Sequence, residues 1–457
     1  MGEFFNGHPI SKLPKTLQDA VRICRNLGFK FIWIDALCIV QDDENDWKEQ
    51  SALMADIYRY SSLNLCAADS AGCGSGVVEM AAPHVMEIAS ATTQSTDTGF
   101  RESVVLVGGP ISTGVAVIDV GRCGLLSRGW VFQEGLCSPR GLYVSRRHGL
   151  WWDCGTMIDM IDSHVSILTG DTGHAFKPRT ERRSFSSLTN LPRHHSMSVQ
   201  DFSFTWYDWM RVYTLRYLTR KTDRLPAVAG MASYVASLSG MKYKAGLWEE
   251  DILRGLMWRR YSAGHAHAER VPGGAPTWSW ASITGPVYYN KFFTMRVDHR
   301  GKIDHRAELD LDIMDTAVEE ERADSFGNVR RGEIKASGVL KHAATMLLRG
   351  KWKPKWEFDV QPAEPEADVL ERCQVLRLAT AYRDKEGTCP VVYFLIIRET
   401  GRRENEYQRV GQGYIVLAYD QHPNRRRFSY RGKPKLNQRL SEKDIWGEPK
   451  KVAITLV

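Results

Sequence analysis

Residues 13–43 carry the clearest structural pattern in the chain and read LPKTLQDAVRICRNLGFKFIWIDALCIVQDD. Apolar side chains recur at helical spacing over residues 17–24 and Gly28 follows as a stop, which predicts an amphipathic helix. Residues 29–40 are apolar, β-branched or aromatic with almost no charge, which predicts a strand buried on both faces of a parallel sheet. We expect residues 31–38 to form a central strand of this sheet, buried on both faces.

The pattern continues beyond this stretch. Acidic residues at 42–46 predict the start of a second helix, and residues 63–68 predict another strand. Helix, strand, helix and strand with short connections indicate an α/β domain wound on a parallel sheet. Asp35 is the carboxylate within the apolar run. Near the carboxyl end of its predicted strand it lies where ligands bind in open α/β sheets, and a structural hydrogen-bonding role is the alternative.

Periodicity is weaker between residues 69 and 122. The glycines of residues 71–76 lack both a following Lys-Ser/Thr pair and the GxGxxG spacing, so they predict a turn in preference to a phosphate-binding loop. The short apolar run at residues 104–107 predicts an insertion that contains a strand or hairpin.

A clear pattern of secondary structure resumes at residues 122–154, RCGLLSRGWVFQEGLCSPRGLYVSRRHGLWWDC. We expect a short helix that carries Trp130 and, one turn later, Glu134, followed by a strand at residues 141–145. The sequence allows two interpretations of Glu134. It is either a functional carboxylate or a helix-surface residue that bonds a backbone amide or an arginine such as Arg140.

Composition narrows the class of protein. A chain of 457 residues, 43% hydrophobic, can bury more than one core. We find no run of about 18 apolar residues and no secretory signal, which predicts a soluble, cytoplasmic protein without a membrane partner. The nine cysteines lack a Cys-x-x-Cys pair, so reduced core thiols are expected and no metal site. The net charge of +7 is small and no nucleic-acid motif accompanies it, which argues against nucleic-acid binding.

The remaining sequence predicts a second region. Residues 219–230 and 246–260 have helical patterns, and residues 375–378, 391–397 and 414–418 have strand patterns. We therefore expect a module at residues 1–155, a linker or insertion at 156–205, and an α+β region at 206–457.

Several blocks of this sequence resemble one known family. They are the quoted residues 13–43, the spacing of Asp46, Trp47, Gln50, Met54 and Tyr58, and RGWVFQEGLCSPRGLYV. In this order they are similar to the successive motifs of the fungal heterokaryon-incompatibility (HET) domain. WYDWMRVYTLRYLTRKTDRLPAVAGMAS, YKAGLWEEDILRGLMWRR, APTWSWAS and YQRVGQG resemble the region that commonly follows it.

The resemblance implies a part in non-self recognition in filamentous fungi, where fusion of unlike hyphae triggers programmed cell death. HET domains have been likened to Toll/interleukin-receptor (TIR) domains, a flavodoxin-like parallel-sheet fold in which some members cleave NAD and others only assemble signalling complexes. By this likeness Glu134 is the catalytic candidate, and Asp35 and Trp130 are candidates for NAD binding. NAD would be a substrate, and no cofactor is expected. The alternative is a non-catalytic death-signalling module that self-assembles or binds other incompatibility proteins, so the resemblance leaves enzymatic activity open.

HET domains usually begin with a strand that reads like Tyr-x-x-Leu-Ser-Tyr-x-Trp-Gly, and the sequence MGEFFNGHPISK does not contain it. In the TIR-like arrangement this strand is central and the following loop lines the nucleotide pocket. Without it, strand edges stay unpaired and the pocket is open to water. We therefore expect weak or absent NAD cleavage, and pairing of the open edge with another chain or with residues 104–107.

Overall fold

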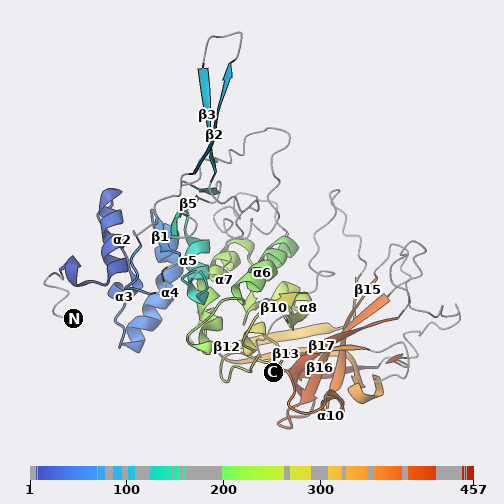
Figure 1. Ribbon diagram of the computed structural model, residues 1–457. Coiled ribbons are helices and arrows are strands. Elements are labelled where there is room, and N and C mark those ends of the chain that lie inside the picture. Colours follow the sequence, from blue (N-terminus) through green and yellow to red (C-terminus); the bar gives the residue numbers. More distant parts are fainter. Residues whose placement is uncertain are drawn as a thin grey trace. The chain divides into compact units, whose positions relative to one another are not determined.

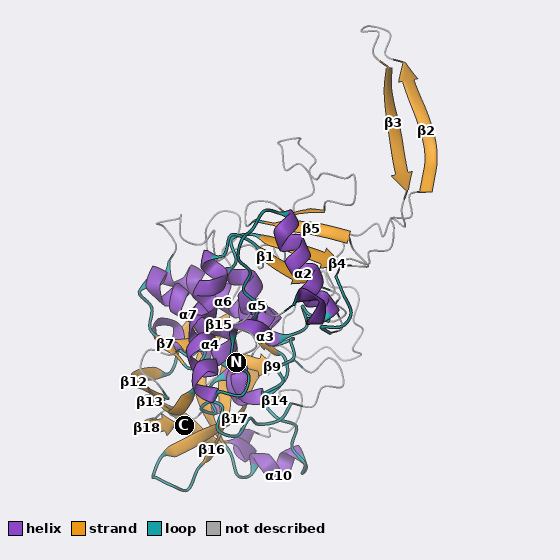
Figure 2. Cartoon of the chain, turned by 90° about the vertical axis from the view of Figure 1, so that its left-hand side faces the viewer, coloured by secondary structure: helices purple, strands orange, loops and turns teal. Residues whose placement is uncertain are grey.

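The structure is a computed structural model, shown in Figure 1, and the chain divides into two compact units, Met1–His194 and His195–Val457. The border lies inside the segment 156–205 that the sequence predicts to connect two parts. The residues described are 7, 9–68, 70, 72–77, 86–94, 101–108, 124–145, 149–154, 158–160, 198–261, 268–289, 307–321, 326–346, 354–382, 390–417, 445–446, 448 and 450–457. Both units mix helices and strands (Figure 2).

The helices of the N-terminal unit follow the sequence pattern. A 3-10 turn, η1 (Ile10–Lys12), precedes α2 (Lys15–Asn26), and α4 spans Glu44–Tyr60. The α4 N-terminus is capped by Asp43, whose carboxylate accepts hydrogen bonds from the backbone amides of Asn45 at 2.8 Å and Asp46 at 3.3 Å. Such caps satisfy amide groups that have no partner within the helix.

The sheet of this unit has the order β1-β4-β5-β6. Its strands are β1 (Asn64–Ala67), β4 (Gly141–Ser145), β5 (Gly149–Asp153) and β6 (Ile158–Met160). The predicted strands at residues 63–68 and 141–145 are confirmed. β1 and β4 are parallel, with α5 (Gly129–Cys137) between them in sequence, whereas β4–β5 and β5–β6 are antiparallel. The described sheet is therefore mixed, and the expectation of a parallel sheet holds for one pairing.

The predicted central strand at residues 31–38 is wrong. Residues 31–34 form no helix or strand, and residues 35–38 form a short helix, α3 (Asp35–Cys38). Phe31 is 91% exposed and Ile32 40% exposed, so the run is not buried on both faces. The physical reason is the lack of a partner, since a strand is stable only when a neighbour takes up its backbone groups. Within the described residues, nothing pairs with residues 31–34.

The insertion contains the expected hairpin. β2 (Met86–Gln94) and β3 (Arg101–Gly108) pair with each other in a two-stranded antiparallel sheet. The run at residues 104–107 therefore pairs with β2 and not with the edge of β1, which corrects the expectation that it is recruited there.

The first half of the C-terminal unit is helical and rich in tryptophan. Its elements are α6 (Val199–Tyr213), η4 (Lys221–Arg224), α7 (Pro226–Ser239), β7 (Tyr243–Lys244), β8 (Leu247–Trp248), η5 (Glu249–Asp251), α8 (Ile252–Gly255), β9 (Trp258–Arg260), η6 (Trp280–Ser282) and β10 (Val287–Tyr289). The predicted helix at residues 246–260 is confirmed only over Glu249–Gly255, because Leu247–Trp248 and Trp258–Arg260 are short strands. Leu247, Trp248 and Trp258 are all 0% exposed, so packing on every side overrides the local helical pattern.

A barrel forms the second half. Its strands are β11 (Ala307–Leu309), β12 (Asp312–Glu320), β13 (Val329–His342), β14 (Lys355–Phe358), β15 (Gln374–Tyr382), β16 (Pro390–Glu399), β17 (Glu406–Val416) and β18 (Lys451–Leu456), and the short helices are η7 (Ala343–Met346) and α10 (Glu366–Leu370). The sheet order is β11-β15-β16-β17-β18-β13-β12, and β13 also pairs with β15, which closes a ring of five strands. The strands predicted at residues 375–378 and 391–397 belong to it, as do residues 414–416 of the strand predicted at 414–418, whereas residue 418 lies outside the described residues.

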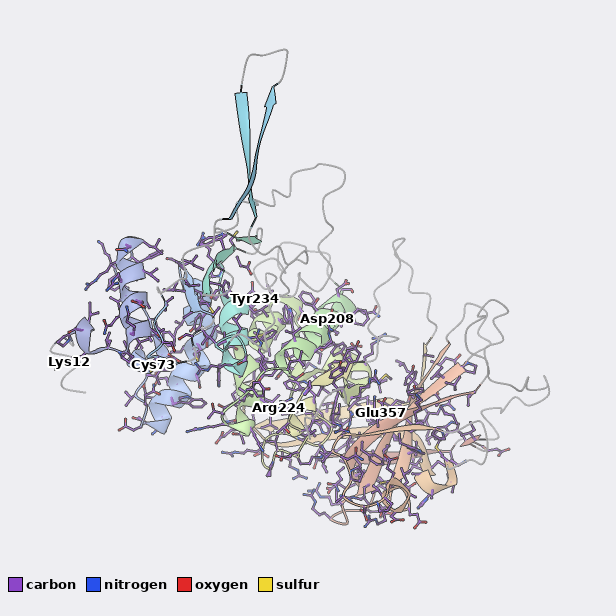
Figure 3. All side chains as sticks on the ribbon, viewed as in Figure 1. Lys12, Cys73, Asp208, Arg224, Tyr234 and Glu357 are labelled. Carbon is purple, nitrogen blue, oxygen red and sulfur yellow. The ribbon has the colours of Figure 1, made fainter. Side chains whose placement is uncertain are left out.

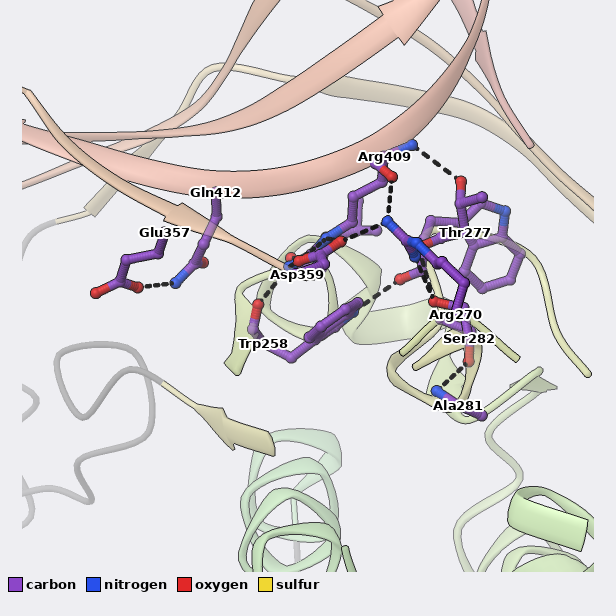
Figure 4. Close-up of polar contacts among 12 residues, drawn as sticks. Trp258, Arg270, Thr277, Ala281, Ser282, Glu357, Asp359, Arg409 and Gln412 are labelled. Atoms are coloured by element: carbon purple, nitrogen blue, oxygen red, sulfur yellow. Dashed lines mark hydrogen bonds and ion pairs between the residues drawn. The ribbon is translucent and has the colours of Figure 1, made fainter. Parts of the chain in front are cut away.

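A buried ion pair joins the barrel to the helical half (Figure 4). Arg409 on β17 is 1% exposed, and its Nε lies 3.1 Å from a carboxylate oxygen of Asp359. Its two terminal nitrogens donate to the carbonyls of Leu256 at 2.6 Å and Trp258 at 2.5 Å. Arg270 donates to the same carboxylate at 3.1 Å. The charge is thus paired and hydrogen-bonded, as a buried charge must be.

Candidate functional site around Glu134

The helix α5 carries the two residues that the sequence singles out. Trp130 lies on its first turn, half-buried, and contacts Trp47 of α4 edge to face, with ring centroids 6.0 Å apart. Glu134 lies one turn later and is also half-buried. The predicted spacing of the tryptophan and the glutamate on one helix is therefore present, and both face the α4 side of the unit.

Glu134 is held by a tyrosine from α4. The Tyr58 hydroxyl donates a hydrogen bond to the Glu134 carboxylate. Burial raises the pKa of the Tyr58 phenol far above its usual value, and the negative charges of Glu134 and Asp35 raise it further. The phenol therefore keeps its proton and acts as a hydrogen-bond donor to the carboxylate. Trp33 packs edge-on against the Tyr58 ring at 5.8 Å.

Asp35 lies in a short helix and not in the strand that the sequence predicts. It is the first residue of α3, where its carboxylate accepts the Ala36 amide at 2.7 Å. Its charge still acts on Tyr58, so Asp35 lies in the electrostatic neighbourhood of the Tyr58–Glu134 pair, and we refer to these three residues as the cluster. Tyr58 is the residue that sequence reasoning missed as a site residue, although it stands at the end of the motif that begins with Asp46.

The cluster does not lie at the carboxyl end of the sheet. The Leu125 amide before α5 bonds the Ala68 carbonyl just after β1 at 3.2 Å. At the other end of α5, the Asn64 side chain donates to the Glu134 carbonyl at 3.5 Å, and Asn64 is the first residue of β1. The helix therefore runs back along β1, and Glu134 lies toward the amino end.

The glycine-rich segment folds back onto the start of α2. The Thr16 amide donates to the Cys73 carbonyl at 2.9 Å, and the Val77 amide donates to the Asp19 carboxylate at 2.9 Å. Asp19 is fully buried and pairs with Lys15 at 2.6 Å. The first turn of α2 is thus occupied by the chain's own carbonyl group, which fits the predicted turn and not a phosphate loop. Cys73 is labelled in Figure 3.

Not all of the cysteines are the buried thiols that the sequence predicts. Cys66, Cys137 and Cys373 are buried, but Cys38 and Cys73 are exposed. Among the described residues no group of three or more His, Cys, Asp or Glu side chains is arranged to hold a metal. No helix in the described part is long and apolar enough to span a membrane.

Two of the C-terminal motifs meet in space (Figure 4). Arg409 belongs to YQRVGQG, and its backbone amide donates to Thr277 of APTWSWAS at 2.9 Å. Arg270, beside the latter motif, donates to the Arg409 carbonyl at 2.6 Å and to the Ser282 hydroxyl at 2.9 Å. The glycines of YQRVGQG are also structural, since a Cβ on Gly411 would lie 2.5 Å from the Glu357 carbonyl of β14. These motifs build the buried junction of the C-terminal unit.

Comparison with known proteins identifies the N-terminal part. Residues 4–134 match the family model described as Heterokaryon incompatibility protein (HET). No curated protein and no solved structure matches the chain. The matched range contains Asp35, Tyr58 and Trp130 and ends at Glu134. Residues 4–134 of this chain are therefore similar to the heterokaryon-incompatibility (HET) domain family.

Proposed function

We propose that this chain is an effector of heterokaryon incompatibility whose activity depends on the cluster of Glu134, Tyr58 and Asp35. A HET domain implies a function in heterokaryon incompatibility in fungi. The observation that carries the proposal is the hydrogen bond from Tyr58 to Glu134. It orients the half-buried carboxylate of Glu134 on α5. The expected setting is the cytoplasm of a fungal cell, and the outcome is programmed cell death.

Cleavage of NAD is the catalytic form of this proposal. Breaking the bond between nicotinamide and ribose develops positive charge on the ribose, and a fixed carboxylate stabilises such a charge. Glu134 is the group we assign to that role, with Tyr58 as its positioning residue. Asp35 adds a second negative charge nearby, and Trp130 offers an aromatic face on the turn before Glu134. NAD is the substrate in this scheme, and the TIR-like arrangement is part of the proposal.

Assembly without catalysis is the second form, and exposed apolar side chains favour it. In the HET domain, Phe31 is 91% exposed, Tyr60 73% and Leu27 50%. Exposed apolar side chains are available to an interaction partner, and they mark an interaction site where they form a contiguous patch. The segment of residues 31–34 also lies beside Asp35, so water reaches this side of the cluster. We therefore expect NAD cleavage to be weak in this chain.

Incubating the purified chain with NAD and measuring nicotinamide release distinguishes NAD cleavage from assembly without catalysis. Release that disappears in Glu134→Gln and persists in Glu49→Gln supports catalysis, because Glu49 is an exposed glutamate of α4. Cell killing without any release supports assembly with itself or with other incompatibility proteins. Robust release that is unchanged in Glu134→Gln would contradict the role that we assign to Glu134.

A further inference from the structure

Trp33 lies in a segment of the N-terminal unit, residues 31–38, most of which is exposed. Within this segment only residues 33–35 are half-buried, and the others are exposed. Trp33 itself belongs to neither a helix nor a strand, so its position is not fixed by regular backbone hydrogen bonds. It is nevertheless turned toward the rest of the unit, and the contact that it makes there defines its role.

The ring of Trp33 contacts Tyr58, in the last turn of α4. The two rings meet edge to face, with centroids 5.8 Å apart and an interplanar angle of 79°. Aromatic pairs favour this geometry, because the positive edge of one ring meets the negative face of the other. A phenol that rotated about its Cα–Cβ bond would lose this contact, so Trp33 restricts the side-chain rotamer of Tyr58.

The backbone of Tyr58 is held independently of Trp33. Ser61 follows the end of α4, and its hydroxyl donates to the Tyr58 carbonyl at 2.7 Å, as its amide does at 3.3 Å. With the backbone held, the direction of the Tyr58 hydroxyl depends on the side-chain torsions. Those torsions place the hydroxyl on the Glu134 carboxylate. A residue that selects the Tyr58 rotamer therefore also decides whether this hydrogen bond forms.

The segment that carries Trp33 is attached to α4 at a second point. The Val40 amide donates to the Asp46 carboxylate at 2.7 Å, and Asp46 lies in the first turn of α4. Ile39, which precedes Val40, is buried. The chain is thus joined to the start of α4 through Asp46 and to its end through Trp33. These two attachments hold the Trp33 ring against Tyr58 without regular secondary structure.

We propose that Trp33 is a positioning residue of the candidate site and acts on Glu134 through Tyr58. The indole ring holds the phenol ring, and the phenol hydroxyl holds the carboxylate. This inference rests on the function proposed for Glu134, because the orientation of that carboxylate matters only if the carboxylate is functional. A purely structural role for Trp33 would require apolar volume at this position, whereas positioning requires an aromatic ring.

The test is cell killing by the full chain in a fungal host, measured as the protein level that kills half of the cells. Trp33→Leu removes the ring and keeps an apolar side chain, whereas Trp33→Phe keeps a ring. We expect Trp33→Leu to need about 2- to 10-fold more protein than the wild type, as the loss of one aromatic pair implies, and Trp33→Phe to resemble the wild type. Phe29→Leu is the matched control, because Phe29 is an exposed aromatic residue of the same region, and it should kill like the wild type.

Combining Trp33→Leu with Tyr58→Phe tests the route of the effect. Tyr58→Phe removes the hydroxyl that bonds the Glu134 carboxylate, so the orientation of the ring at residue 58 no longer matters. Residues that act through one contact have effects that do not add. We therefore expect Trp33→Leu to cause no further loss of killing in the Tyr58→Phe background.

Glu134→Gln, tested in parallel, separates this proposal from the proposed function. If Glu134→Gln kills like the wild type, the proposed function fails and the role of Trp33 fails with it. If Glu134→Gln is inactive, the positioning role alone is refuted by wild-type killing in Trp33→Leu, by equal losses in Trp33→Leu and Trp33→Phe, or by a full further loss in the Tyr58→Phe background. If Trp33→Leu does not fold, Trp33→Met replaces it, because a flexible apolar side chain fills the same space without a ring.

Discussion

Replacing Asp359 with asparagine should destabilise the C-terminal unit strongly. Asp359 is 1% exposed, and its carboxylate contacts Arg409 Nε at 3.1 Å, Arg409 Nη2 at 3.1 Å and Arg270 at 3.1 Å. Asparagine keeps the shape and removes the charge, which leaves the fully buried Arg409 without a counterion. Breaking a buried pair in this way costs about 3–5 kcal/mol. Because single domains are stable by only about 5–15 kcal/mol, the loss is a large fraction of the total.

Urea unfolding followed by tryptophan fluorescence measures this loss, since Trp206, Trp209, Trp248, Trp258, Trp278 and Trp280 are all buried in this unit. Asp312→Asn is the matched control. Asp312 forms an exposed ion pair with Lys451 at 2.5 Å, and such pairs contribute about 0–1 kcal/mol. If Asp359→Asn and Asp312→Asn lose the same small amount, the buried network does not hold the two halves of the unit together and the reasoning fails.

Three further outcomes are expected. Phe31→Ser should leave the free energy of unfolding within about 0.5 kcal/mol of the wild-type value, because Phe31 is 91% exposed. A large decrease in that free energy would instead support the buried strand predicted at residues 31–38. Gly413→Ala should cost about 1–3 kcal/mol through overpacking, as its Cβ would lie 2.4 Å from the Phe394 ring, and an unchanged urea midpoint would contradict this. Burial raises the pKa of Tyr207 well above its usual value, so the unfolded chain loses that proton first as pH rises. Stability should therefore fall above about pH 10, and Tyr207→Phe should flatten this part of the profile.

The sequence alone predicted those helices and strands whose formation depends on residues close together in the chain. The helix α4 begins where Asp43 can cap it, and β1 and β4 are short apolar runs flanked by polar residues. The spacing of Trp130 and Glu134 within one helix was also predictable, because it depends only on five consecutive residues. In these cases the neighbouring chain adds packing but does not change the local preference.

The predictions that were wrong concern segments whose structure depends on residues distant in the sequence. Residues 31–34 have the composition of a buried strand but no strand beside them in the described part, so their composition alone could not fix their structure. Residues 246–260 have helical spacing, yet Trp206 and Trp280 both donate to the Gly246 carbonyl at 2.9 Å, which holds the backbone in an irregular path. The pairing of Tyr58 with Glu134 joins residues from two helices, and no pattern within either helix reveals it.

The most direct test of the role of Glu134 is cell killing in a fungal host by the wild type, Glu134→Gln and the control Glu49→Gln, at equal protein levels. Glu134→Gln keeps a group that can accept the Tyr58 hydrogen bond, so its thermal stability should change by less than about 1 kcal/mol. We predict that killing falls sharply in Glu134→Gln and is unchanged in Glu49→Gln. Killing by Glu134→Gln equal to that of the wild type would contradict the functional role of Glu134.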